Sequence, residues 1–148
     1  METPTIGKLV QAKASNKVWT IGPEAVVYEA LELMAAHDVG ALLVLEAGKV
    51  AGIFSERDYA RKVILKGKTS KTARVREMMA TPVLYATPDM SLDECMSLMT
   101  EKRVRHLPVM DGETLIGIVS VGDVIKRIIA NQHHEIRQLE KYLRGGGG

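Results

Sequence analysis

The sequence reads Gly-Ile-Phe-Ser-Glu-Arg-Asp at residues 52–58 and Gly-Ile-Val-Ser-Val-Gly-Asp at residues 117–123. The glycine, isoleucine, serine and aspartate occupy the same places in both stretches, 65 residues apart. Each stretch begins as an apolar strand, and a helix is predicted to start after its serine. We therefore expect a hydroxyl and a carboxylate together at the N-terminus of a helix, twice in one chain.

The match extends outward from these stretches over residues 18–60 and 83–125 without a gap. Twelve of the 43 aligned positions are identical, whereas chance would give roughly two or three. The apolar residues of one helix in each copy share the same helical spacing: Val27, Ala30, Leu31 and Met34, then Leu92, Cys95, Met96 and Met99. Duplication of one folding unit explains this pattern.

Each copy is predicted to fold as β-α-β-β-α. The expected strands are residues 18–21, 41–46 and 50–54, then 83–86, 107–110 and 115–119. One copy buries too little apolar surface to be stable alone, so we predict an α/β (α+β) fold in which two pseudo-symmetric repeats pack as one module. The expected boundaries are 5–65 for the first repeat, 66–74 for a basic linker, 75–130 for the second repeat, 131–144 for a C-terminal helix and 145–148 for a frayed glycine tail.

Composition excludes several classes of protein. Apolar residues make up 46% and charged residues 26% of the 148 residues, a globular balance. The net charge of +2 gives no bulk attraction to nucleic acid or anionic lipid, and the longest apolar run is only Ala41–Leu45. The single cysteine, Cys95, cannot form an intramolecular disulfide. We expect a cytoplasmic protein without a membrane anchor.

Two further segments need interpretation. Residues 61–76 contain seven basic residues and no acidic one, which is typical of a solvated linker; binding to phosphate or nucleic acid is the alternative. The C-terminal helix carries apolar residues near heptad spacing: Ile125, Ile129, Ile136, Leu139 and Leu143. Mixed charges on this helix favour packing against the module or a second subunit over contact with a membrane.

The duplicated Ser-x-x-Asp suggests a nucleotide site. Amide groups and the positive dipole end at a helix start favour an anion, and Ser55 or Ser120 can add a hydrogen bond. A carboxylate three residues on, Asp58 or Asp123, accepts hydrogen bonds only and can receive both hydroxyls of a ribose. The alternative is a capping box, in which the same side chains satisfy the helix's own backbone. The residues alone leave both readings open.

The paired repeats, the Gly-Ile-x-Ser-x-x-Asp endings and the stretch Val-Arg-His-Leu-Pro-Val at 104–109 resemble tandem CBS domains, the Bateman module. The resemblance covers residues 5–127. It implies a regulatory sensor that binds adenosine-containing ligands such as AMP, ATP, NAD or S-adenosylmethionine in clefts between repeats, forms a homodimer and signals to an effector protein.

The resemblance also implies roles for individual residues. It places ribose on Asp58 and Asp123, and phosphate near Ser55, Ser120, Arg57, Arg105 and His106. It places adenine against Trp19, Val39 and Ile118 in the Asp123 cleft and against Leu84, Val104 and Ile53 in the Asp58 cleft. Trp19 can also be read as a core or interface aromatic, His106 as a strand histidine and Arg57 as a solvated cation.

No catalytic site is expected. No nucleophile, base and orienting group come together in the sequence, the adjacent His133 and His134 lack metal-ligand spacing, and Cys95 falls on a buried helical stripe. We therefore predict neither a metal nor a catalytic cofactor. The competing hypothesis is a ligand-free CBS adaptor whose apolar helices mediate assembly.

Overall fold

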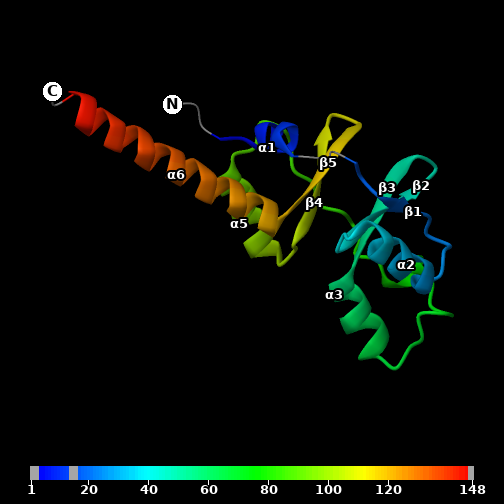
Figure 1. Cartoon of the computed structure of the whole chain (residues 1–148). Helices are drawn as coiled ribbons and strands as arrows, with labels where there is room; N and C mark the ends of the chain where they lie inside the picture. Colours follow the sequence, from blue (N-terminus) through cyan, green and yellow to red (C-terminus); the bar gives the residue numbers. More distant parts are fainter. Residues whose placement is uncertain (1–3, 14–16, 147–148) are drawn as a thin grey trace. The chain divides into compact units, whose positions relative to one another are not determined.

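The computed structural model describes residues 4–13 and 17–146 and divides the chain into two compact units. The central unit contains residues 17–84, and the terminal unit joins residues 1–16 to residues 85–148. Each unit contains one repeat, coloured blue to green and green to red in Figure 1. The segment that precedes each repeat in the sequence, however, belongs to the unit of the other repeat.

A three-stranded sheet forms the centre of the central unit. Strand β1 (Thr20–Ile21) runs parallel to β2 (Ala41–Glu46), and β2 pairs antiparallel with β3 (Lys49–Ser55). The first four residues of β2 are all buried, as its apolar run predicts. The β2–β3 turn places Ala47 and Gly48 at φ values of 52° and 78°, the left-handed geometry of a tight hairpin.

Helices enclose the core of this sheet. Helix α2 (Val27–His37) lies between β1 and β2 in the chain; α3 (Glu56–Asp58) continues into the π-helical segment η1 (Tyr59–Ile64), and α4 (Val75–Met78) follows. Residues from all of these except α3 form the core: Val27, Ala30, Met34, Leu42, Val44, Phe54, Val63, Ala73, Val75 and Met78.

The second hairpin and three helices form the terminal unit. Strands β4 (His106–Asp111) and β5 (Thr114–Ser120) pair antiparallel, with α5 (Leu92–Lys102) before them and α6 (Val121–Gly146) after them. Helix α1 (Ile6–Ala12) joins this unit: the N–H of Gly7 donates to Pro88 O at 2.9 Å, and Val10 approaches Gly117 so closely that a Cβ on Gly117 would lie 3.1 Å from Val10 Cγ1. Glycine is therefore required where α1 covers β5.

Several element boundaries differ from the sequence predictions. Strand β1 covers only half of the expected 18–21, and in the expected strand 83–86 only Ala86 pairs, through a single parallel bridge to Val109. Tyr85 is exposed, so this segment lacks the buried face that would hold a longer strand in register. Helix α6 runs without a break from Val121 through Gly146, two residues into the expected tail, while residues 147–148 lie outside the described residues.

Candidate functional site

The junction between β3 and α3 is a closed capping box. The N–H of Ser55 donates to Asp58 Oδ2 at 3.0 Å, and the N–H of Asp58 donates to Ser55 Oγ at 3.2 Å. The N–H of Glu56, the first of the helix, donates to Gly40 O at 3.0 Å. These bonds hold the carboxylate against its own main chain, as the capping alternative predicted.

The junction between β5 and α6 repeats this geometry. The N–H of Ser120 donates to Asp123 Oδ2 at 2.9 Å, and the N–H of Asp123 donates to Ser120 Oγ at 3.0 Å. The N–H of Val121 donates to Arg105 O at 2.9 Å. At each helix start the first and third N–H groups therefore already have protein acceptors, which narrows the room for the anion contacts expected there.

Each carboxylate also pairs with a lysine. In the central unit Lys62 Nζ lies 3.1 Å from Asp58 Oδ1, one helical turn away, and donates to Met78 O at 3.2 Å. The side chain of Asp58 is 16% exposed. Because the pair has i, i+4 spacing on a continuous helical segment, it could have been anticipated from the sequence.

The lysine of the terminal unit comes from the other end of the chain. Lys13 Nζ lies 3.1 Å from Asp123 Oδ2 and donates to Ile118 O at 2.9 Å. Burial alone would raise the pKa of Asp123, but the hydrogen bonds from Ser120 and Lys13 together with the charge of Lys13 outweigh it and lower the pKa. The sequence offered no signal for Lys13, because 110 residues separate it from Asp123.

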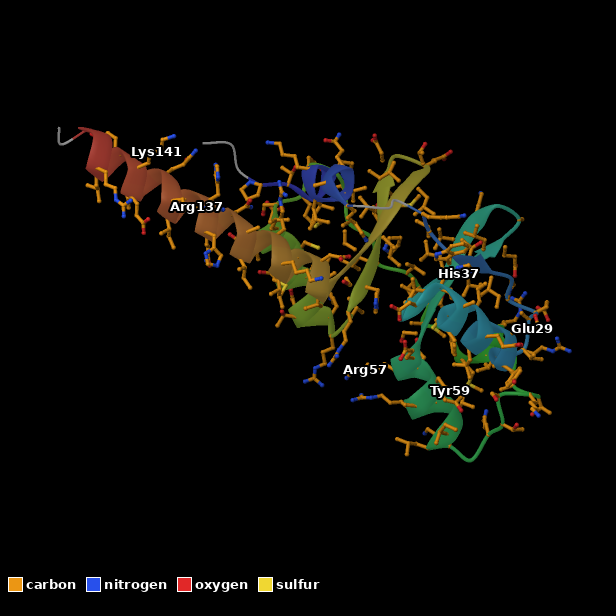
Figure 2. All side chains as sticks on the ribbon, in the orientation of Figure 1. Glu29, His37, Arg57, Tyr59, Arg137 and Lys141 are labelled. Atoms are coloured by element: carbon orange, nitrogen blue, oxygen red, sulfur yellow. The ribbon has the colours of Figure 1, made fainter. Side chains whose placement is uncertain are left out.

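The predicted phosphate ligands lie near these helix starts. Arg57, labelled in Figure 2, is the second residue of α3 and is partly buried. In the terminal unit Arg105 is exposed directly before β4, and His106, the first residue of that strand, is partly buried. Since the cations of the two units differ in number and position, the uneven distribution of charge predicted from the sequence extends to the structure.

The six predicted adenine-contacting residues share one property: each is partly buried, neither in a core nor fully exposed, namely Trp19, Val39, Ile53, Leu84, Val104 and Ile118. Within the central unit the ring of Trp19 stacks on His37, with the centroids 3.3 Å apart and the planes 10° from parallel. Lys17 Nζ lies 4.5 Å from the Trp19 ring centroid, a cation–π contact. His37, labelled in Figure 2, is thus a neighbour of the candidate site that sequence reasoning missed.

The basic run 61–76 does not form one uniform cationic patch. Besides Lys62, Arg76 contacts two acids of the central unit, with Nε 2.6 Å from Glu24 Oε1 and an amino group 2.5 Å from Glu46 Oε2. Hydrogen bonds to Glu24 and then Glu46 raise the pKa of Arg76. Much of the positive charge in this segment is therefore balanced within its own unit.

Other candidate chemistry is sparse. Cys95 is fully buried, and burial raises the pKa of its thiol, so the reactive thiolate is disfavoured. Within residues 4–13 and 17–146 no three His, Cys, Asp or Glu side chains gather as a metal site would require. None of the helices described there is both long and apolar enough to cross a bilayer.

Comparison with known proteins accounts for the duplicated junction. The family model described as "CBS domain" matches residues 10–65 and again residues 75–130. The CBS domain-containing protein CBSX3, mitochondrial, of Arabidopsis thaliana is 35% identical over 154 residues, covering 98% of this chain and 74% of the relative.

Solved structures agree with this match. A protein with CBS domains from Burkholderia ambifaria, associated with signal transduction, has a TM-score of 0.83 at 48% identity, covering 86% of this chain and 96% of that one. The CBS domain pair of protein MJ0100, solved in complex with 5′-methylthioadenosine and S-adenosyl-L-methionine, has a TM-score of 0.72 at 22% identity and covers 88% of this chain and 99% of that one. The latter likeness concerns the fold alone.

Proposed function

Because the chain belongs to the CBS domain family, which matches both of its repeats, we propose that it is a non-catalytic regulatory module that binds an adenosine-containing nucleotide. AMP, ATP and NAD are the proposed ligands, and their occupancy is transmitted to an effector protein. The complex of the MJ0100 pair with two adenosyl compounds supports this ligand class. The proposed location is the cytoplasm, although the Arabidopsis relative is named mitochondrial.

The observation that carries the proposal is the carboxylate fixed at each helix start. A carboxylate has about four acceptor sites, so Asp123 can keep its bond from Ser120 while it accepts ribose hydroxyls. The lysine on each carboxylate is the group that a ribose would replace or move. Lys13 would then be released toward the phosphates of the ligand.

The phosphate and adenine groups complete the proposal. Arg105 and His106 serve the ligand of Asp123, with Arg57 and Ser55 at the other site, so the number of phosphates sets the affinity. A ligand can shift the arrangement of the module only by its different affinity for two states. The nucleotide's charge is therefore the variable that the module senses.

A thermal-shift panel with AMP, ATP, NAD and S-adenosylmethionine tests the proposal. A ligand at 100 times its Kd should stabilise the protein by about 2.7 kcal/mol. Fluorescence of Trp19, the single tryptophan, provides a second readout beside a predicted adenine site. No stabilisation by any of the four at millimolar concentration would exclude the adenosine ligands.

Asp123→Ala should weaken nucleotide affinity about ten- to a hundred-fold, the effect of losing hydrogen bonds to a charged group worth about 1.5–3 kcal/mol. Asp111→Ala is the matched control, because Asp111 is an exposed acid at the end of β4 in the same unit. Isothermal titration of both folded variants separates ligand contact from helix capping. Equal affinities would remove ribose from Asp123.

Arg105→Ala should reduce affinity for ATP more than affinity for adenosine, because only ATP offers phosphate oxygens to the guanidinium. Titrations with the two ligands give the ratio. Equal losses would mean that Arg105 acts through folding instead.

The second candidate function is a ligand-free adaptor. One observation favours it: both carboxylates already accept hydrogen bonds from their own backbone and pair with a lysine. A flat thermal-shift panel together with a stable assembly in solution would favour the adaptor over the sensor.

A further inference from the structure

Helix α6 carries an exposed apolar stripe that the nucleotide proposal does not use. Its members lie on one face and are 41–65% exposed: Ile125, Ile129, Ile136, Leu139 and Leu143. Their spacing of four, seven, three and four residues is that of alternating a and d positions in a heptad, with Gln132 at the one remaining place. We call these six residues the α6 stripe.

The α6 stripe is separate from the face by which the helix joins its own unit. Val124 is buried and Arg127, Ile128 and Asn131 are partly buried, so this neighbouring face packs against the terminal unit. From Gln132 to Arg144 every residue is exposed. Figure 1 shows this part of α6, orange to red, continuing past α5 and the β4–β5 hairpin of the same unit.

A helix of this kind needs a partner. The exposed part has about 13 residues, a length at which an isolated helix is marginal in water, so packing of its apolar face must hold it. Basic residues occupy the opposite side: Arg137 and Lys141, labelled in Figure 2, are one turn apart and take heptad positions that face water. The apolar face is thus the one to be covered.

We propose that the α6 stripe pairs with the same stripe of a second copy of this chain, as an antiparallel two-helix coiled coil centred on His134. In this register Ile125 meets the partner's Leu143, Ile129 meets the partner's Leu139, and Gln132 meets the partner's Ile136. The paired segment of 19 residues is about 28 Å long at 1.5 Å per residue.

Charge complementarity selects the antiparallel direction. Beside the antiparallel stripe Lys126 faces the partner's Glu140, and symmetry makes this attraction twice; Glu135 meets its own copy once across the axis. A parallel pair places Glu135 against the partner's Glu140 twice and gives Lys126 no acid. Since both directions bury the same stripe, the flanking charges decide between them.

Sedimentation equilibrium of three variants tests the interface and its direction. Leu139→Lys should weaken self-association by about 100-fold or more, because each dimer loses two apolar layers and buries two charges. Lys141→Glu, on the outer face, is the matched control and should leave the dimer intact. Because both side chains are exposed, circular dichroism should show the core of either variant still folded.

Charge reversal then distinguishes the directions. Glu140→Lys should weaken an antiparallel dimer by about 10-fold, since each Lys126 then faces a lysine, and adding Lys126→Glu should restore it. The same Glu140→Lys change would strengthen a parallel dimer by removing its like-charge contacts. A monomeric wild-type chain at roughly 100 µM, a dimer unaffected by Leu139→Lys, or a dimer tightened by Glu140→Lys would each overturn the proposal. None of these results depends on nucleotide binding.

Discussion

The two strand-to-helix junctions have the same local hydrogen bonds but different surroundings. Serine and aspartate bond each other's backbone at 3.0 and 3.2 Å in the central unit and at 2.9 and 3.0 Å in the terminal unit. The lysine on Asp58 comes from the next turn, whereas the lysine on Asp123 comes from α1. Duplicated sequence therefore reproduces local geometry, while the segment packed beside each copy supplies different chemistry.

The same contrast holds for the residue that backs each glycine. Val10 of the segment with α1 lies against Gly117, and Met79, directly after α4, lies against Gly52. Both segments precede one repeat in the sequence and pack on the other. Substitutions at equivalent positions should separate what the repeats share from what their neighbours impose.

The largest difference is expected in the cores. Phe54→Ala should lower the free energy of unfolding by about 3–5 kcal/mol, whereas Val119→Ala at the equivalent position should cost about 1.5–3 kcal/mol, because the phenyl ring leaves the larger cavity. Urea unfolding followed by circular dichroism measures both. Trp19 fluorescence follows the central unit separately, and equal costs would mean that the two cores pack alike.

The next difference is expected at the glycines. A Cβ on Gly52 would collide with Met79 Sδ and approach Ala80 O to 3.1 Å, whereas on Gly117 it meets Val10 at 3.1 Å. Gly52→Ala should therefore cost about 1–3 kcal/mol and Gly117→Ala less. The order of the two urea midpoints checks this, and a reversed order would show that α1 is held more rigidly than α4.

The caps should give equal effects. Ser55→Ala and Ser120→Ala each remove one hydroxyl acceptor from a helix N–H, so each should cost about 0.5–2 kcal/mol. Thermal melts of the two variants measure the costs. A large inequality would contradict the idea that the duplicated motif fixes its own energetics.

The smallest effect concerns Lys13. Because the folded-state pKa of Asp123 is lowered, its stabilising contribution is present above the unfolded value of about 3.9 and is lost as the pH falls through the lower folded value. Lys13→Met should reduce stability by about 1 kcal/mol near neutral pH, with a smaller difference from wild type in acid. Urea midpoints at several pH values measure it; a difference that grows in acid would argue against the ion pair.

Most of the secondary structure could be predicted from the sequence. The apolar run at Ala41–Leu45, the hairpin spacing and the helical periodicity after Val27 are local signals, and the corresponding elements form where expected. The exceptions are segments such as 83–86, where apolar residues alternate but no continuous neighbouring strand completes the ladder. Pairing between distant segments is not encoded in a local pattern.

The sequence by itself determined the repeat, the family and the two capping motifs, because these depend on residue identity and short spacing. Only the tertiary structure decided that α1 packs on the second repeat, that Lys13 reaches Asp123, and that Trp19 stacks on His37. The physical reason is distance along the chain. Contacts between far-separated residues form only when buried apolar surfaces bring their elements together, and the residues themselves show no sign of the partner they will meet.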